Sequence, residues 1–253
     1  MGNRFFPNIA LANALGYNGQ SIRGLGRNAD LDIGTGYEDI WTTGGSKTWS
    51  TTAAAIEVVS TSANDAAAGT GARTILIEGI GADYLPLSET ITMNGATIVA
   101  GNAAKLYLDV WRASVVTTGS GLVNAGTITV RYPAGSTLTT IPVHATAGGM
   151  SVSQNTHYII PADKIGLIYA VYISISGTAK SDIVFWTQLD NSGFTPTAPK
   201  KVLTMYSVVT GFRIFSQEVP LYLPPRTKLW FSANTDTDNT EIMVGYDLAV
   251  VNL

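Results

Sequence analysis

The most constraining feature of the chain is a series of about a dozen short apolar runs, separated by turn-forming residues at spacings of roughly 8–15 residues. Apolar and polar residues alternate in many of these runs with the period of two that is typical of strands, as over residues 72–82, 88–93 and 126–132. No helical pattern long enough for a βαβ crossover lies between consecutive runs. The sequence therefore predicts an all-β fold with an antiparallel β-sandwich or jelly-roll-like body.

The first 41 residues differ from the rest because they are rich in Gly and Asn and lack a strand pattern. Their most regular segment is a short helical window, Asn8–Leu15, which Gly16 would end. We expect an irregular N-terminal arm over residues 1–41, a first β region over 42–147 and a second over 148–253. The sequence allows the two β regions to form either two domains or one continuous sandwich.

Three local signals give more specific expectations. Asn94-Gly95 is the dipeptide most typical of a two-residue β-hairpin. The run 105–117 predicts one long strand. Residues 236–241 (DTDNTE) resemble part of a calcium loop, but Gly is missing from the sixth position and Glu from the twelfth, so we expect a turn between two strands.

The residue types needed for common enzyme chemistry are sparse. Cysteine is absent, only His144 and His157 could serve as catalytic histidines, and no G-x-S-x-G elbow or phosphate-binding glycine loop is present. Two carboxylate pairs are candidates for glycoside hydrolysis, Glu38 with Asp39 and Glu78 with Asp83. An acidic pair in a loop more often accepts backbone N–H groups. We therefore expect no enzymatic activity, no cofactor and no bound metal.

Charge argues against a nucleic-acid partner, and the length of the apolar runs argues against a membrane-spanning helix. The net charge is −3 and the sequence pI about 5.3, whereas broad nucleic-acid binding needs many cations. The longest apolar stretch, residues 165–175, is about half the length of a membrane-spanning helix. Charged residues make up only 13% of the chain, so a monomer would have few charges to solvate its surface. We expect a homo-oligomer, specifically a homotrimer, with no nucleic-acid or membrane partner.

Aromatic residues allow two interpretations. The five tryptophans, with several tyrosines, could form a platform on which sugars stack. Aromatic side chains are also enriched in strands and at protein interfaces, so core and interface packing is the favoured interpretation. A carbohydrate-binding β-sandwich therefore stands as an alternative function.

The arm is the strongest candidate for binding a partner. It carries apolar residues that no strand or long helix accommodates, and no acidic residue precedes Asp30. Such a segment is expected to order on a neighbouring subunit, with arginines attracted to an acidic surface and aromatic rings buried as anchors. The expected partner-binding residues are Arg4, Phe5, Phe6, Tyr17, Arg23 and Arg27.

Four segments carry a resemblance to a known group of proteins: GRNADLDIGTGYEDIW (residues 26–41), residues 56–95, GLVNAGTITV (121–130) and TDTDNTEIMVGYDLAVV (235–251). Together they resemble structural proteins of tailed-bacteriophage virions. The resemblance implies a virion component assembled in the cytoplasm of the host bacterium, with the major capsid protein or other virion proteins as partners. A capsid decoration or cement protein is the expected role, and a tail, head-fibre or host-attachment component is the alternative.

Overall fold

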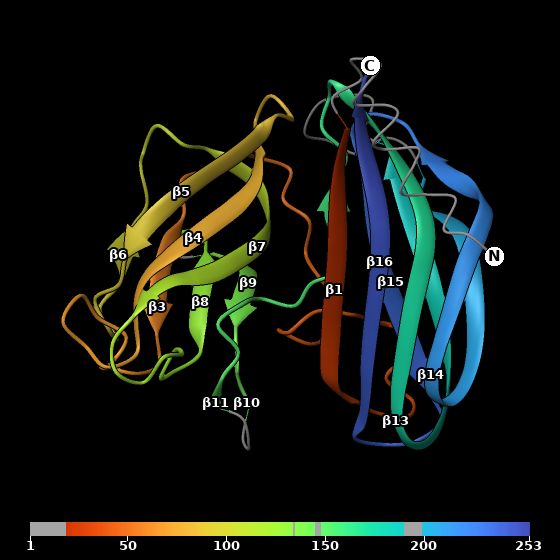
Figure 1. Ribbon diagram of the computed structural model, residues 1–253, viewed down its shortest axis with the longest axis horizontal. Coiled ribbons are helices and arrows are strands. Elements are labelled where there is room, and N and C mark those ends of the chain that lie inside the picture. Colours follow the sequence, from red (N-terminus) through yellow and green to blue (C-terminus); the bar gives the residue numbers. More distant parts are fainter. Residues whose placement is uncertain (1–18, 134, 145–147, 190–198) are drawn as a thin grey trace.

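The computed structural model describes residues 19–133, 135–144, 148–189 and 199–253 (Figure 1). Every strand pairing among them is antiparallel and the described residues contain no helix, so the all-β prediction is confirmed. Consequently no described segment is a helix able to cross a membrane. The predicted helical window at Asn8–Leu15 lies outside the described residues.

The larger part of the fold is a seven-stranded sheet in the order β1-β16-β13-β15-β12, with β14 paired to β13 and β2 paired to β15. Its strands come from both ends of the chain. They are β1 (Gly19–Leu31), β2 (Glu38–Asp39), β12 (Tyr158–Ile159), β13 (Lys164–Leu189), β14 (Lys201–Leu223), β15 (Thr227–Thr235) and β16 (Thr240–Asn252).

Strands β13 and β14 bend this sheet back on itself. Residues 164–175 of β13 pair with β16, whereas residues 181–189 pair with β15, and β14 follows β13 along both parts. The bend lies where the register shifts between Ile175 and Lys180, and Gly177 and Gly211 there have φ of 68° and 98°, which favours glycine. The curled sheet encloses a core that includes Val171, Phe185 and other side chains from both layers.

The smaller part is built from residues 57–149. A four-stranded sheet has the order β6-β3-β8-β9, a three-stranded sheet the order β5-β4-β7, and β10 pairs with β11. The strands are β3 (Glu57–Ser60), β4 (Ala72–Gly81), β5 (Pro86–Thr92), β6 (Val99–Ala100), β7 (Tyr107–Thr118), β8 (Ile128–Arg131), β9 (Thr137–Ile141), β10 (Val143–His144) and β11 (Gly148–Gly149). Isoleucine and valine side chains from the four-stranded and three-stranded sheets, such as Ile75 and Val130, form one buried cluster between the two sheets.

The prediction of an irregular arm over residues 1–41 is wrong for residues 19–31, which form strand β1. Residues 19–28 pair in continuous register with β16, from Gly19 opposite Val251 to Asn28 opposite Ile242. The partner strand lies more than 200 residues away, and few of the β1 side chains are buried, so alternating hydrophobicity does not reveal the strand.

The expectation of a hairpin at Asn94-Gly95 is also wrong in part. A turn forms there, with Gly95 at φ 61° and the Thr97 N–H donating to the Asn94 carbonyl at 3.1 Å. However, β5 before it pairs with β4, and β6 after it pairs with β3 in the other sheet. The dipeptide therefore moves the chain between two sheets and does not join neighbouring strands.

Candidate functional site

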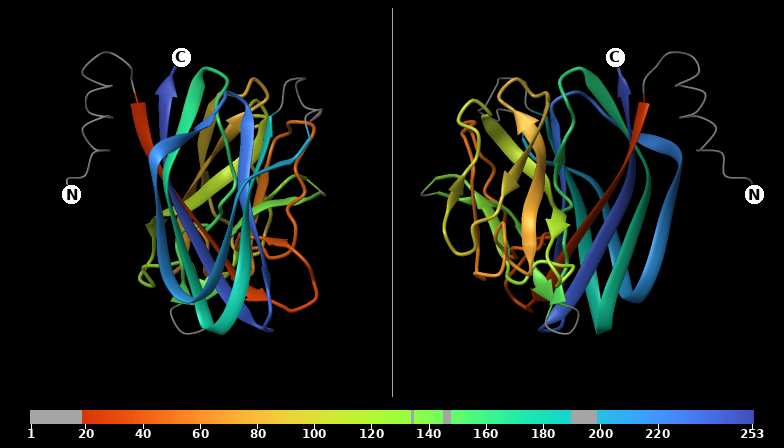
Figure 2. Two further views of the ribbon diagram at one scale, coloured as in Figure 1. Left: turned by 90° about the vertical axis from the view of Figure 1, so that its right-hand side faces the viewer. Right: turned by 60° about the vertical axis from the view of Figure 1, so that its left-hand side comes forward.

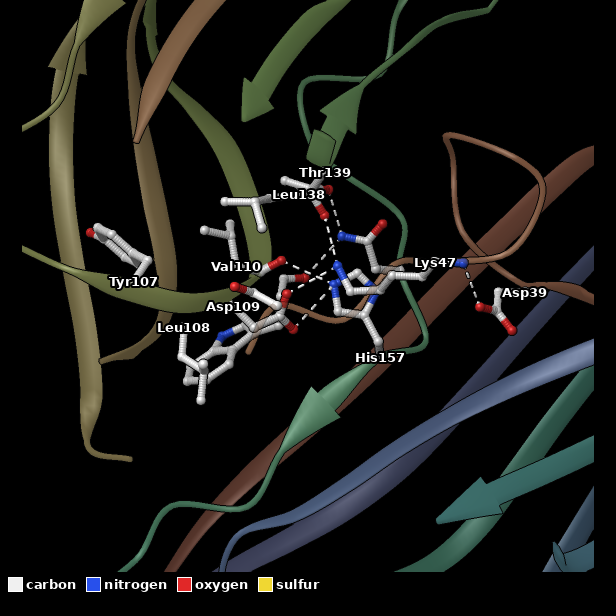
Figure 3. A network of polar contacts seen from close by, with 12 residues as sticks. Asp39, Lys47, Tyr107, Leu108, Asp109, Val110, Leu138, Thr139 and His157 are labelled. Atoms are coloured by element: carbon white, nitrogen blue, oxygen red, sulfur yellow. Dashed lines mark hydrogen bonds and ion pairs between the residues drawn. The ribbon is translucent and has the colours of Figure 1, made fainter. Parts of the chain in front are cut away.

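A buried polar cluster lies where the two parts of the fold meet, and we call its three side chains, Lys47, Asp109 and His157, the junction cluster (Figure 3). Lys47 lies in the loop after β2, Asp109 in β7, and His157 directly before β12. The Lys47 Nζ is 3.0 Å from Asp109 Oδ1, and the His157 Nε2 is 3.7 Å from Asp109 Oδ2. The cluster therefore joins a strand of the three-stranded sheet to segments that flank strands of the seven-stranded sheet.

Further contacts fix the cation of the junction cluster. The Lys47 Nζ also donates to the Leu138 carbonyl at 3.1 Å, and it lies 5.1 and 5.5 Å from the ring centroids of Trp41 and Trp49. Burial alone would raise the pKa of Asp109, but the charge of Lys47 and the hydrogen bonds that the carboxyl accepts together lower it below its usual value. Lys47 and Asp109 thus form a buried ion pair.

His157 is neutral in this setting. Burial, together with the nearby charge of Lys47, lowers its pKa to about 4. Its Nε2 is 3.0 Å from the Val110 carbonyl, which can only accept, so Nε2 carries the proton. The side chains of all three cluster residues are only 2–3% exposed, so they lie almost wholly in the protein interior. The arrangement is that of an internal polar contact between the two parts of the fold.

The low pKa of His157 predicts a pH dependence of stability. In the unfolded chain a histidine binds a proton below about pH 6.5, whereas folded His157 binds one only near pH 4. The unfolded state thus binds more protons than the folded state between these two pH values. The free energy of unfolding should therefore fall by about 3 kcal/mol as the pH drops from about 6.5 to about 4. Urea unfolding of the wild type and of His157→Gln at pH 4.5–7 measures how the free energy of unfolding depends on pH. The same dependence on pH in both proteins would contradict the prediction.

The carboxylate pair Glu38 and Asp39 organises the loop that carries Lys47. Asp39 Oδ2 accepts the Lys47 backbone N–H at 2.7 Å, and its Oδ1 accepts the Ser232 hydroxyl at 2.6 Å. Glu38 Oε2 accepts the Gly45 N–H at 3.0 Å. Burial raises the pKa of Asp39. The predicted role of this pair, accepting backbone N–H groups in a turn, is confirmed.

The other candidate residues have separate partners. Glu78 faces Arg112 across the β4–β7 pair, with 3.7 Å between Oε2 and Nε, while Asp83 accepts the Leu85 N–H within a turn. Residues 236–239 form the turn between β15 and β16, as predicted. Within the described ranges, no three His, Asp or Glu side chains are grouped closely enough to hold a metal ion.

Two of the five tryptophans are buried, and the other three are half-buried. Trp41 and Trp230 are 5% and 4% exposed, and the Trp230 ring contacts Trp49 and Trp186 with centroid distances of 5.5 and 6.2 Å. Trp111 packs on Tyr158 at 4.6 Å. These contacts favour the packing interpretation over a sugar-binding platform made of all five rings.

One open groove, with a volume of about 520 Å³, lies between β1 and the β4–β7 face. Trp111, Tyr158 and Tyr246 contribute aromatic surface to it, while Arg23 and Arg112 contribute cations. A small polar ligand could enter this groove, and a carbohydrate-binding role would be sought here.

The six residues predicted to bind a partner divide into two groups. Arg4, Phe5, Phe6 and Tyr17 lie outside the described residues. Arg23 and Arg27 lie in β1, where their Nε atoms pair with Asp247 at 2.8 Å and Glu241 at 2.7 Å on β16. Both arginines are therefore paired within the chain, because strand pairing brings together residues more than 200 positions apart, and their binding of a partner stays a prediction.

An exposed apolar edge, which the sequence analysis missed, runs along β14. Among the described residues β14 pairs only with β13, so its other edge faces outward. Figure 1 places β14 on the side farthest from β3–β9, and the left view of Figure 2 brings it to the front. We define the β14 edge by its eight exposed large apolar side chains: Val202, Leu203, Met205, Val209, Phe212, Ile214, Val219 and Tyr222.

Comparisons with known proteins add little to this picture. No family model matches the chain, and no curated protein matches it. A structure of the Gt strain of infectious bursal disease virus is 10% identical, with 93% of this chain and 72% of that chain covered and a TM-score of 0.26. The crystal structure of the VP2 subviral particle of the same virus covers 92% and 72%, with 10% identity and a TM-score of 0.19. At these TM-scores the likeness carries no argument about fold or function.

Proposed function

We propose that the chain is a non-enzymatic structural protein of a tailed-bacteriophage virion, and specifically a capsid decoration or cement protein. The observation that carries an assembly role is the β14 edge, because soluble monomers seldom leave a long, apolar edge strand uncovered. The resemblance of residues 26–41, 56–95, 121–130 and 235–251 to phage virion proteins supplies the kind of assembly. Its site of action would be the virion, assembled in the host cytoplasm.

The mechanism would be stabilisation by mass action. A subunit that binds the assembled shell, and not its separated parts, lowers the free energy of the assembled state. The curled sheet and the buried junction cluster provide a stiff body, while residues 1–18 would reach the major capsid protein or another virion protein. A tail, head-fibre or host-attachment component uses the same features and is the alternative within the virion.

The groove beside Trp111 favours a second candidate, carbohydrate binding. Aromatic rings with nearby charged and amide side chains are the usual means of holding a sugar, and Glu78, Arg112 and Gln154 line this groove. An attachment protein would combine this property with a place in the virion. Binding of cell-surface glycans to the purified protein, lost in Trp111→Ala, would favour this candidate over cement.

The proposal predicts that purified protein binds to shells that lack it. Full-length protein added to particles from a deletion mutant should bind in hundreds of copies, whereas a variant without residues 1–18 should not bind. This boundary leaves the described strand β1 whole, because Gly19 is the first described residue that pairs with β16. Circular dichroism should give the same β spectrum for both proteins.

Gel analysis of sedimented particles measures the bound copies. If the shortened protein binds in as many copies as the full-length protein, the proposed role of residues 1–18 is contradicted. Failure of the full-length protein to bind any particle fraction would contradict the virion role itself.

A further inference from the structure

We propose that the β14 edge is the surface on which a second copy of this chain docks. This inference rests on the proposed function in taking the chain as an assembling subunit, and it names the partner of one surface. It concerns β14 and not residues 1–18, so it can fail while the virion role holds.

The β14 edge concentrates apolar exposure in one strand. Its eight residues are among eighteen large apolar side chains that are exposed in the described part of the chain. Val219 is 78% exposed, and Met205, Val209, Phe212, Ile214 and Tyr222 are each 55–56% exposed. Strands that remain at a sheet edge usually carry lysines or prolines that discourage pairing, whereas the stretch Val202–Phe212 contains no charged residue and no proline. Its pairing with β13 is irregular at Leu203, between Val202 and Thr204.

The exposed area matches what a subunit interface requires. A large apolar side chain presents on the order of 150–200 Å², so eight that are exposed by 38–78% leave roughly 650–900 Å² of apolar surface. The largest apolar patch on a typical monomer is about 300–600 Å², and a stable interface buries about 800 Å² on each partner. One β14 edge is therefore large enough to form most of one side of an interface.

The charge of the strand favours a copy of the same chain over a strongly charged partner. Only Lys201, Arg213 and Glu218 are charged among its 23 residues, and their signs are mixed. A nucleic acid or an acidic membrane would select a basic surface, which this strand lacks. A second copy presents the same neutral apolar strand, so matching surfaces are present automatically in a homo-oligomer.

The test compares two isoleucines with similar exposure. Ile214, in β14, is 55% exposed and Ile98, before β6, is 49% exposed. The wild type should have a mass by light scattering of at least twice 26.7 kDa at micromolar concentration. Ile214→Lys should weaken self-association at least about 100-fold, because it places an unpaired charge in the interface, whereas Ile98→Lys should associate like the wild type.

Two outcomes of this test would overturn the inference. One is a monomeric mass for the wild type, and the other is an Ile214→Lys protein that self-associates as tightly as the wild type. Met205→Lys is a second variant in the other half of β14 and should also weaken association. Thermal unfolding should confirm that each variant is folded, because all three positions are about half exposed.

Two further experiments distinguish a second copy on β14 from residues 1–18 as the interface, and distinguish this inference from the proposed virion role. A protein lacking residues 1–18 should still associate, and a monomeric mass for it would overturn the inference in favour of those residues as the interface. A monomeric wild type that still binds particles would overturn this inference alone. An oligomer that binds no particle would overturn the proposed function alone.

Discussion

Replacing Asp109 by alanine is expected to destabilise the protein by about 3–5 kcal/mol, because the change leaves the Lys47 ammonium buried without its counter-charge. The remaining partners of Lys47, the Leu138 carbonyl and two tryptophan rings, do not replace a full negative charge. Urea unfolding at pH 7 measures the loss. A value below about 1 kcal/mol would contradict a structural role for the buried ion pair.

A matched control comes from an exposed ion pair. Asp163 lies 3.5 Å from Lys164 and its side chain is 55% exposed, so Asp163→Ala should cost less than about 0.5 kcal/mol. A double variant, Lys47→Met with Asp109→Leu, removes both buried charges together. It should recover much of the stability lost in Asp109→Ala, since apolar side chains of similar size often replace a buried ion pair without loss.

Replacing Asp65 by alanine should have an effect of similar size, about 4 kcal/mol. Asp65 is fully buried, and its Oδ1 accepts the N–H groups of Ala72 at 2.7 Å and Ala125 at 2.8 Å. Its Oδ2 accepts the Gly126 N–H at 2.9 Å and the Ser60 hydroxyl at 2.6 Å. Each donor left without an acceptor in the interior costs about 1–3 kcal/mol, and the four losses are not fully additive.

Asp65 joins two loops that are far apart in sequence, residues 61–71 and 119–127, which is why one carboxylate has this effect. The control is Asp83→Ala, because Asp83 is exposed and accepts only the Leu85 N–H in its turn. It should cost less than about 1 kcal/mol. Equal losses for the two variants in thermal or urea unfolding would contradict the account of Asp65.

Strands with one buried face were predictable from the sequence, because burial imposes the alternation that reveals them. Ile75 and Ile77 of β4 and Ile128 and Val130 of β8 are fully buried, and both strands lie where alternation placed them. Strand β1 was not predictable, because its register depends on a partner strand at the other end of the chain. The bend of β13 was hidden for a similar reason, since local pattern does not specify which neighbour each half joins.

The junction cluster left only a weak trace in the sequence. Asp109 interrupts an apolar run, Leu106–Trp111, and a carboxylate in such a run is seldom buried without a partner. Nothing in the sequence identifies Lys47 as that partner, because the two residues are 62 positions apart and only the fold brings them together. The β14 edge had a clearer signal, namely a run of apolar residues with few charges on either face.

The proposal that the chain is a virion component is tested most directly by its copy number in purified particles of the proposed phage. Quantitative mass spectrometry can express its amount relative to the major capsid protein in the same particles. A decoration or cement role predicts hundreds of copies per particle. A handful of copies would contradict the cement role and favour a tail component, and absence from particles would contradict the virion role altogether.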